Sequence, residues 1–145
     1  MKQEKICSKY VADASVLIKW FGKEIEDLEQ AQKFEEDFKK RHIEILLPAF
    51  AFWEVSSHLG RKYSVSEATH LFSAFSLYRF KQLFLTLGSN FLAFKIMKKY
   101  PKVSFYDASY HSLAMEYGAI FLTADLKYYN QAKSFGNIML LKDYK

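Results

Sequence analysis

The stretch YVADASVLIKW, residues 10–20, is a largely apolar run that the carboxylate of Asp13 interrupts, and it gives the first indication of the fold. Residues 9–12 are typical of a short buried strand, and Asp13 ends it. A carboxylate among apolar residues is costly unless it is solvated, paired or bound to a metal ion. An aspartate can also close a turn by bonding to its own backbone. The apolar neighbours on both sides instead favour a functional carboxylate at the end of a buried strand.

Beyond this stretch, strand and helix patterns alternate to the end of the chain. Apolar residues recur at steps of three and four over residues 25–38, which predicts an amphipathic helix. Short apolar runs predict further strands at 43–47, 82–87, 119–123 and 138–141. The run at 82–87 is also compatible with the tail of the preceding helix. Helices are expected to begin at residues that suit a first turn, namely Pro48, Ser64 or Ser66, Ser89 or Asn90, Ser104 and Asp125.

This alternation predicts an α/β fold, in which a mainly parallel sheet carries helices on both faces. The whole chain, residues 1–145, is expected to form a single domain, because its length suits one compact core. In such sheets, ligands bind at the carboxyl ends of the strands, near the point where the strand order reverses. We therefore expect a functional site at that edge of the sheet.

Composition excludes several classes of protein. Half of the 145 residues are apolar and five are glycine, which argues against disorder, and no run is long enough to span a membrane. The single cysteine, Cys7, permits no internal disulfide, and the N-terminal region lacks a signal-peptide pattern. We therefore expect a soluble cytoplasmic protein. The net charge of +5 favours polyanionic partners, although many small basic domains bind no nucleic acid.

Three further carboxylates also lie near the edges of predicted elements: Glu54 in AFWEVSSHL, Asp107 in FYDASYHSLA and Asp125 in IFLTADLKYY. Two of them have ordinary explanations, since Asp107 can complete a capping box and Asp125 suits a helix N-cap. Together with Asp13, however, they are placed so that they can converge at the edge where ligands bind. Four carboxylates close together repel one another, and a hard cation such as Mg²⁺ or Mn²⁺ relieves that repulsion.

Basic and hydroxyl side chains accompany these carboxylates. Arg61 shares a helix face with Glu54, and Arg61 and Lys62 are candidate contacts for a substrate phosphate. Both also suit the C-terminus of a helix, where positive charge is favourable. Ser15 is a candidate to orient Asp13 or a bound water, or simply caps the following turn. His111 is a candidate ligand, but no second histidine lies at ligand spacing, so a structural role is favoured.

At these residues the chain resembles the PIN-domain nucleases, and among them the VapC-like toxins of prokaryotic type II toxin–antitoxin systems. The matching pieces are VADASVLIKW, the glutamate of AFWEVSSHL, FYDASYHSLA and IFLTADLKYY, in the family's order and across nearly the whole chain. The resemblance implies a three-layer α/β/α fold with about five strands in the order 3-2-1-4-5. It also implies an acidic Mg²⁺ or Mn²⁺ site supported by hydroxyl groups. Its residues are the carboxylates Asp13, Glu54, Asp107 and Asp125 and the hydroxyls Ser15 and Thr123.

The same resemblance implies a divalent-metal-dependent endoribonuclease that acts as a toxin, forms a homodimer and is inhibited by an antitoxin. Asp13 and Asp107 are the expected direct metal ligands, while Glu54 and Asp125 bind directly or through water. Two alternatives stay open: an RNA-processing nuclease of this family without an antitoxin, and a non-catalytic module that binds RNA or protein. A phosphatase of the haloacid-dehalogenase type is disfavoured, because it needs a second aspartate where this chain has Ser15.

Overall fold

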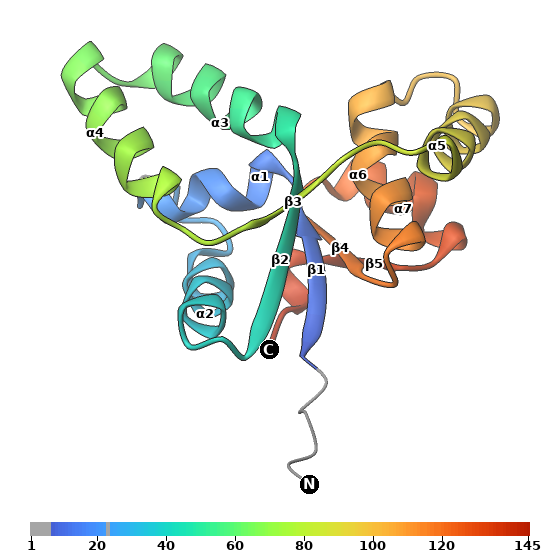
Figure 1. Cartoon of the computed structure of the whole chain (residues 1–145), viewed down its shortest axis with the longest axis horizontal. Coiled ribbons are helices and arrows are strands. Elements are labelled where there is room, and N and C mark those ends of the chain that lie inside the picture. Colours follow the sequence, from blue (N-terminus) through green and yellow to red (C-terminus); the bar gives the residue numbers. More distant parts are fainter. Residues whose placement is uncertain (1–6, 23) are drawn as a thin grey trace, which may run out of the picture.

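The structure, a computed structural model, describes residues 7–22 and 24–145. Within these residues lies a five-stranded sheet in which all neighbouring strands are parallel, in the order β3-β2-β1-β4-β5 (Figure 1). The expected α/β class and strand order are thus confirmed. The strands are β1 (Ser8–Ala12), β2 (Ile43–Pro48), β3 (Lys81–Leu83), β4 (Ile120–Thr123) and β5 (Ile138–Leu140).

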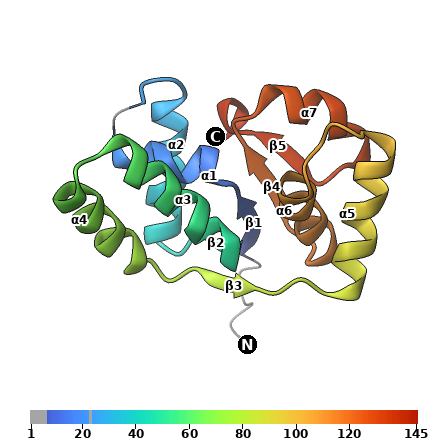
Figure 2. The ribbon, with the colours of Figure 1, turned by 90° about the horizontal axis from the view of Figure 1, so that it is seen from above.

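Helices cover both faces of this sheet and complete three layers. The α-helices are α1 (Ala14–Leu17), α2 (Leu28–Lys39), α3 (Ala49–Lys62), α4 (Val65–Ser76), α5 (Leu87–Lys99), α6 (Phe105–Glu116) and α7 (Leu126–Ala132). Figure 2 shows α1 to α4 on one side of the sheet and α5 to α7 on the other. This arrangement follows from right-handed crossovers that run in opposite directions from the middle of the sheet.

The strand order reverses between β1 and β4. From β1 the chain proceeds to β2 and β3 on one side, whereas β4 and β5 lie on the other side. Sheets of this kind bind ligands at this point, beyond the carboxyl ends of the strands. The register pairs Ala12 of β1 with Leu122 of β4, so the residues that follow them, Asp13 and Thr123, meet at this edge.

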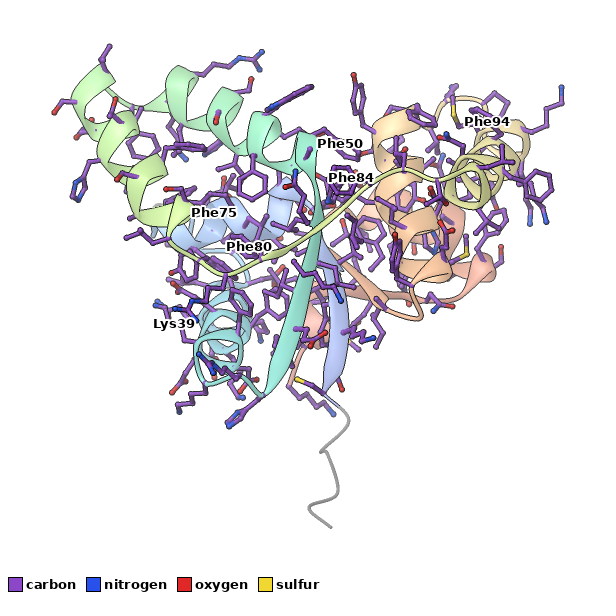
Figure 3. All side chains as sticks on the ribbon, viewed as in Figure 1. Lys39, Phe50, Phe75, Phe80, Phe84 and Phe94 are labelled. Atoms are coloured by element: carbon purple, nitrogen blue, oxygen red, sulfur yellow. The ribbon has the colours of Figure 1, made fainter. Side chains whose placement is uncertain are left out.

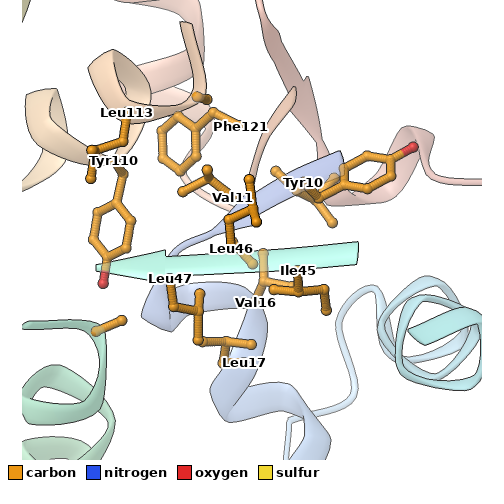
Figure 4. Close-up of a cluster of buried hydrophobic side chains, with 14 of the residues drawn as sticks. Tyr10, Val11, Val16, Leu17, Ile45, Leu46, Leu47, Tyr110, Leu113 and Phe121 are labelled. Carbon is orange, nitrogen blue, oxygen red and sulfur yellow. The ribbon is translucent and has the colours of Figure 1, made fainter. Parts of the chain in front are cut away.

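The central strands are buried on both faces. Val11 of β1, Leu47 of β2 and Leu122 of β4 have no exposed surface. Figure 4 shows side chains from β1, α1, β2 and α6 packed into one cluster. Burying each such side chain stabilises the fold by roughly 1.5–3 kcal/mol. Asp13 directly follows this packed strand, so the core holds its backbone in place.

Two boundaries near the third strand differ from the expectation. The strand spans Lys81–Leu83 rather than 82–87, and α5 begins at Leu87 with Thr86 as its cap rather than Ser89 or Asn90. The Thr86 hydroxyl accepts a hydrogen bond from the Ser89 N–H at 3.1 Å, and the Ser89 hydroxyl accepts one from the Thr86 N–H at 2.8 Å. This reciprocal capping box satisfies both N–H groups and places the cap three residues earlier than expected.

The other helix starts agree with their capping residues. Ser64, one of the two expected candidates, caps α4 in a capping box with Glu67. Ser104 caps α6 and Asp125 caps α7 through their side chains, as expected. No α-helix in the described ranges combines the length and apolar character needed to cross a bilayer.

Candidate functional site

Asp13 lies directly after β1 and is 8% exposed. Its carboxylate caps α1 by accepting a hydrogen bond from the Val16 N–H at 3.3 Å. Thr123 of β4 donates its hydroxyl to Oδ2 at 2.6 Å, and the Ser15 hydroxyl donates to Oδ1. Burial nevertheless raises the pKa of Asp13 to about 6, because these donors do not fully replace the lost hydration.

The same two hydroxyls also hold the loop that follows β4. Thr123 Oγ1 accepts a hydrogen bond from the Asp125 N–H at 3.1 Å, and Ser15 Oγ accepts one from the Ala124 N–H at 3.1 Å. Each hydroxyl therefore links the Asp13 carboxylate to the backbone of this loop. The structure places both expected hydroxyls in contact with Asp13, and it ties the position of Asp125 to that of Asp13.

Asp125 precedes α7 as its N-cap, and Asp107 lies in the first turn of α6. Asp125 is exposed and caps α7, with Oδ1 accepting from the Tyr128 N–H at 3.0 Å. The Asp107 N–H donates to Ser104 Oγ at 3.1 Å at the start of α6. Burial raises the pKa of the Asp107 carboxyl, the Ser104 hydroxyl lowers it, and the charge of Asp125 raises it again. These two carboxylates are therefore close enough to repel one another.

Glu54 projects from the second turn of α3 and is half-buried. Tyr110 of α6 donates its hydroxyl to Glu54 Oε2 at 2.8 Å, and Figure 4 shows this hydroxyl directed away from α6. Burial raises the pKa of Glu54, the Tyr110 hydroxyl lowers it, and the charge of Asp107 raises it. Sequence analysis missed Tyr110 because it resembles a core aromatic. The signal that could have found it is the need of a buried tyrosine hydroxyl for a partner.

Replacing Tyr110 by phenylalanine is expected to raise the pKa of Glu54 further. The change removes the hydroxyl that opposes burial and the Asp107 charge, both of which favour the neutral carboxyl. It should also lower the free energy of unfolding by about 1–2 kcal/mol at neutral pH. Carbon-13 NMR titration of Glu54 and urea unfolding measure the two effects. Tyr106→Phe, on the exposed side of the same helix, is the control, and an unchanged Glu54 pKa in Tyr110→Phe would contradict the assignment.

Asp107 links the four carboxylates electrostatically. Its charge raises the pKa of Asp13 and of Glu54, and the charge of Asp125 raises that of Asp107. In the described part of the chain, no three His, Cys, Asp or Glu side chains are grouped closely enough to hold a metal ion as they stand. The donors are all anionic oxygens, which fits a hard divalent cation held by one or two carboxylates together with water.

A groove of about 690 Å³ opens between α1 and α3 beside this rim. Ser15 lines it from α1, and Glu54, Arg61 and Lys62 line it from α3, so both candidate phosphate contacts face the same space as Glu54. Lys62 Nζ lies 4.0 Å from a Glu24 carboxylate oxygen. Two further side chains, Ser57 and His58, complete the polar lining. Ser57 was not proposed from the sequence, although its position three residues after Glu54 places it near the same helix face.

His111 has a structural role. It has no exposed surface, and its Nε2 lies 2.6 Å from the Gly136 carbonyl oxygen while Nδ1 lies 2.9 Å from the Tyr128 hydroxyl. A carbonyl only accepts, so Nε2 carries the proton and Nδ1 accepts from Tyr128. Burial lowers the pKa of His111, which keeps the imidazole neutral. The favoured interpretation from the sequence agrees with this arrangement.

Comparisons with known proteins agree with this fold. A toxin–antitoxin complex from Klebsiella pneumoniae superposes with a TM-score of 0.67 at 13% identity, covering 91% of this chain and 97% of that chain. VapC20 of Mycobacterium tuberculosis, a toxin that cleaves the sarcin–ricin loop, has a TM-score of 0.63 at 13% identity, covering 83% and 93%. VapBC2 of Rickettsia felis, bound to a DNA fragment from its promoter, has a TM-score of 0.66 at 13% identity, covering 91% and 96%. At this identity the likeness shows the fold alone.

Sequence comparison gives the family. No curated protein matches the sequence. A sequence profile of the PIN domain matches residues 10–134, from β1 to the 3₁₀ turn after α7. The matched region contains all four carboxylates of the rim, and it spans most of the chain. This chain therefore belongs to the PIN domain family.

Proposed function

We propose that this chain is a divalent-metal-dependent endoribonuclease that hydrolyses RNA phosphodiester bonds and acts as the toxin of a toxin–antitoxin pair. The observation that carries the proposal is the rim of Asp13, Glu54, Asp107 and Asp125, in which the charge of Asp107 raises the pKa of Asp13 and Glu54 and the charge of Asp125 raises that of Asp107. Membership of the PIN domain family supports a nuclease, and the toxin structures with the same fold support the toxin assignment.

The rim suits Mg²⁺ or Mn²⁺, which prefer oxygen ligands and keep several waters. Asp13 and Asp107 would hold the cation directly, and Glu54 and Asp125 would bind its waters. When bound, the cation lowers the pKa of a coordinated water and neutralises charge on the phosphoryl oxygens.

The protein's own residues then have distinct roles. Ser15 and Thr123 hold the Asp13 carboxylate in one orientation through their hydroxyl bonds. Tyr110 holds Glu54, which lines the groove, through its hydroxyl bond, and Glu54 orients a water there and accepts its proton. Arg61 binds a backbone phosphate of the RNA in the same groove.

Removal of divalent ions is expected to reduce RNA cleavage by the purified protein to background. Excess Mg²⁺ or Mn²⁺ should restore it, because the carboxylate rim alone cannot activate water or tolerate a phosphate. The measurement is cleavage of mixed RNA with EDTA and after metal addition. Cleavage that persists undiminished in EDTA would overturn the metal role, and RNA binding with no cleavage in either metal would identify a non-catalytic module.

Replacing Arg61 by glutamine is expected to weaken RNA binding about tenfold and to reduce the dependence of binding on salt by about 0.7 in log–log slope. The residue is exposed in the groove, so the change removes one phosphate contact without disturbing the core. Lys9→Gln is the matched control. Lys9 is exposed near the start of β1, at the end of the sheet opposite the carboxylate rim. Equal losses in both variants would show a diffuse charge effect instead of a phosphate contact.

We also infer a cytoplasmic homodimer inhibited by an antitoxin protein. Large apolar side chains at the start and along the outside of α5 are exposed, including Phe84 and Phe94, which are labelled in Figure 3, and Leu87. An apolar patch of this kind supports association. Light scattering should give twice the monomer mass.

The antitoxin is tested separately. Expression of the protein should arrest growth, and co-expression of a small neighbouring gene product should relieve the arrest. An RNA-processing nuclease would need no such neighbouring gene product.

A further inference from the structure

Strand β2 has an open edge along its first half. On one side, Ile43 to Leu46 pair with β1. On the other side, β3 begins only at Lys81, opposite Leu46, and runs to the end of β2. Among the described residues, no strand flanks residues 43–45 on that side. An edge left open in this way presents backbone N–H and C=O groups to whatever lies beside it.

A groove of about 610 Å³ lies along this open edge. Its apolar lining comes from α2, from β2 itself and from the connection between α4 and β3. These residues are Phe38, Ile43, Ile45, Leu77 and Tyr78. Leu77 is 81% exposed, so an apolar partner in the groove would gain burial there.

The groove lies at the opposite end of the sheet from the carboxylate rim. Its β2 residues are at the start of the strand, whereas Glu54 follows the end of β2 in α3. Figure 3 shows Lys39, which lines the groove, on the α2 side of the molecule and apart from Phe50 at the start of α3. Whatever binds here does not share the proposed nuclease site.

Positive charge dominates the polar lining. Lys39, Arg41, Arg79 and Lys81 face the groove, against the single carboxylate of Glu44. Lys39 is already engaged, because its Nζ lies 2.8 Å from the Glu35 carboxylate and 5.7 Å from the centre of the Tyr78 ring. Arg41, Arg79 and Lys81 form no ion pair with any carboxylate of the described residues, and all three are exposed.

We propose that this groove binds an extended acidic segment of a partner protein, which adds as a strand to the open edge of β2. The segment would continue the line of β3 and pair with the backbone of Ile43, Glu44 and Ile45. Successive side chains of a strand point to opposite faces. Apolar side chains of the segment would therefore contact Leu77 and its neighbours, while its carboxylates would meet Arg41, Arg79 and Lys81.

A peptide explains this surface better than RNA does. The unpaired strand edge offers the backbone N–H and C=O groups of alternate residues, which the backbone of a polypeptide strand can match. The exposed apolar side chain of Leu77 can be covered by an apolar side chain of a peptide but gains little from a ribose–phosphate chain. Positive charge attracts both an acidic peptide and RNA, so it predicts only that the partner is negatively charged. The open strand edge is what favours a peptide over RNA.

The first test uses a fluorescein-labelled peptide of twelve residues that alternates glutamate and valine. Fluorescence anisotropy with the full-length protein should show saturable binding that weakens with salt, and the same peptide with lysine for glutamate should not bind. The Arg41→Glu, Arg79→Glu double variant should weaken binding at least about tenfold. The Lys95→Glu, Lys98→Glu double variant, which reverses two exposed charges on α5, is the matched control and should bind normally.

The second test separates strand addition from simple charge attraction. A peptide methylated at alternate backbone nitrogens should lose binding, and the amides at the open edge of β2 should exchange more slowly with solvent when the unmodified peptide is bound. RNA cleavage by the Arg41→Glu, Arg79→Glu variant should equal that of the wild type. Equal cleavage would show that the variant is folded and that the groove is separate from the nuclease site.

Three results would overturn the proposal. One is equal weakening of peptide binding in the α5 control variant, which would indicate diffuse attraction. Another is undiminished binding of the methylated peptide, which would exclude strand addition. The third is displacement of the peptide by a single-stranded RNA whose own binding depends more strongly on Arg41 and Arg79, which would make the groove a nucleic-acid site.

Discussion

Asp13→Asn is expected to reduce Mg²⁺-dependent RNA cleavage by about 10³-fold or more, which corresponds to about 4 kcal/mol of transition-state stabilisation. The amide has nearly the same shape as the carboxylate, and it can still accept from Val16 and bond to the Ser15 and Thr123 hydroxyls. It lacks the negative charge that a hard cation requires. Single-turnover cleavage assays measure the loss, and circular dichroism checks the fold.

Asp37 provides a matched control for this variant. It is also 8% exposed, and its carboxylate accepts from the Tyr144 hydroxyl at 2.8 Å and pairs with Lys33 at 2.6 Å. Asp37→Asn is expected to lower stability through these lost contacts, with unchanged cleavage per folded molecule. If Asp37→Asn lost as much activity per folded molecule as Asp13→Asn, the effect of the latter would reflect damage to the fold rather than loss of a metal ligand.

The second large effect is a dependence of stability on pH that originates at Asp13. Burial raises the pKa of this carboxyl from 3.8 to about 6 in the folded protein. Between these two values the folded protein retains a proton that the unfolded chain has released. The free energy of unfolding in the absence of metal therefore falls as pH rises through this window, by up to about 3 kcal/mol from this group. Above pH 6 the contribution levels off.

Asp13→Asn removes that contribution, so the variant is expected to be more stable than the wild type at pH 7 in EDTA and nearly equal to it near pH 4. Urea unfolding at several pH values measures both proteins. The difference in unfolding free energy between the two proteins isolates the contribution of Asp13 from those of other groups. Asp37, for example, has a lowered pKa, so its contribution to stability rises with pH instead of falling. Mg²⁺ should stabilise the wild type more than the variant. If the free energies of unfolding of the two proteins changed with pH in parallel, the raised pKa of the Asp13 carboxyl would be refuted.

Local sequence predicted most of the fold but misplaced several boundaries, most clearly those on either side of residues 84–86. The apolar runs and their caps located four of the five strands closely, and the alternation indicated a parallel sheet. Around Thr86 and Ser89, two residues of similar capping ability compete. Local preference favours neither of them, and the reciprocal hydrogen bonds between the two select Thr86. The Thr86 hydroxyl also donates to the Glu116 carboxylate at 2.6 Å, a contact across thirty residues that sequence spacing does not reveal.

The candidate site divides in a similar way. The carboxylates were proposed because an acid in an apolar run has few explanations, and Ser15 lies two residues after one of them. Tyr110 was not found, because its spacing in α6 is that of a buried apolar stripe and only its contact with Glu54 reveals a second role. The groove lined by Ser57 and His58 was likewise invisible, since a groove exists only when α1 and α3 are packed side by side.

Periodicity and burial cost were enough to indicate the α/β class, and to single out the edge of the sheet and the carboxylates that we propose for the site. These properties depend on residues within a few positions of one another. The contact of Asp13 with Thr123, the repulsion among Asp107 and its neighbours, and the open edge of β2 were decided by the tertiary structure alone. Each depends on strand order and register, which bring together residues far apart in the chain and leave others without a partner.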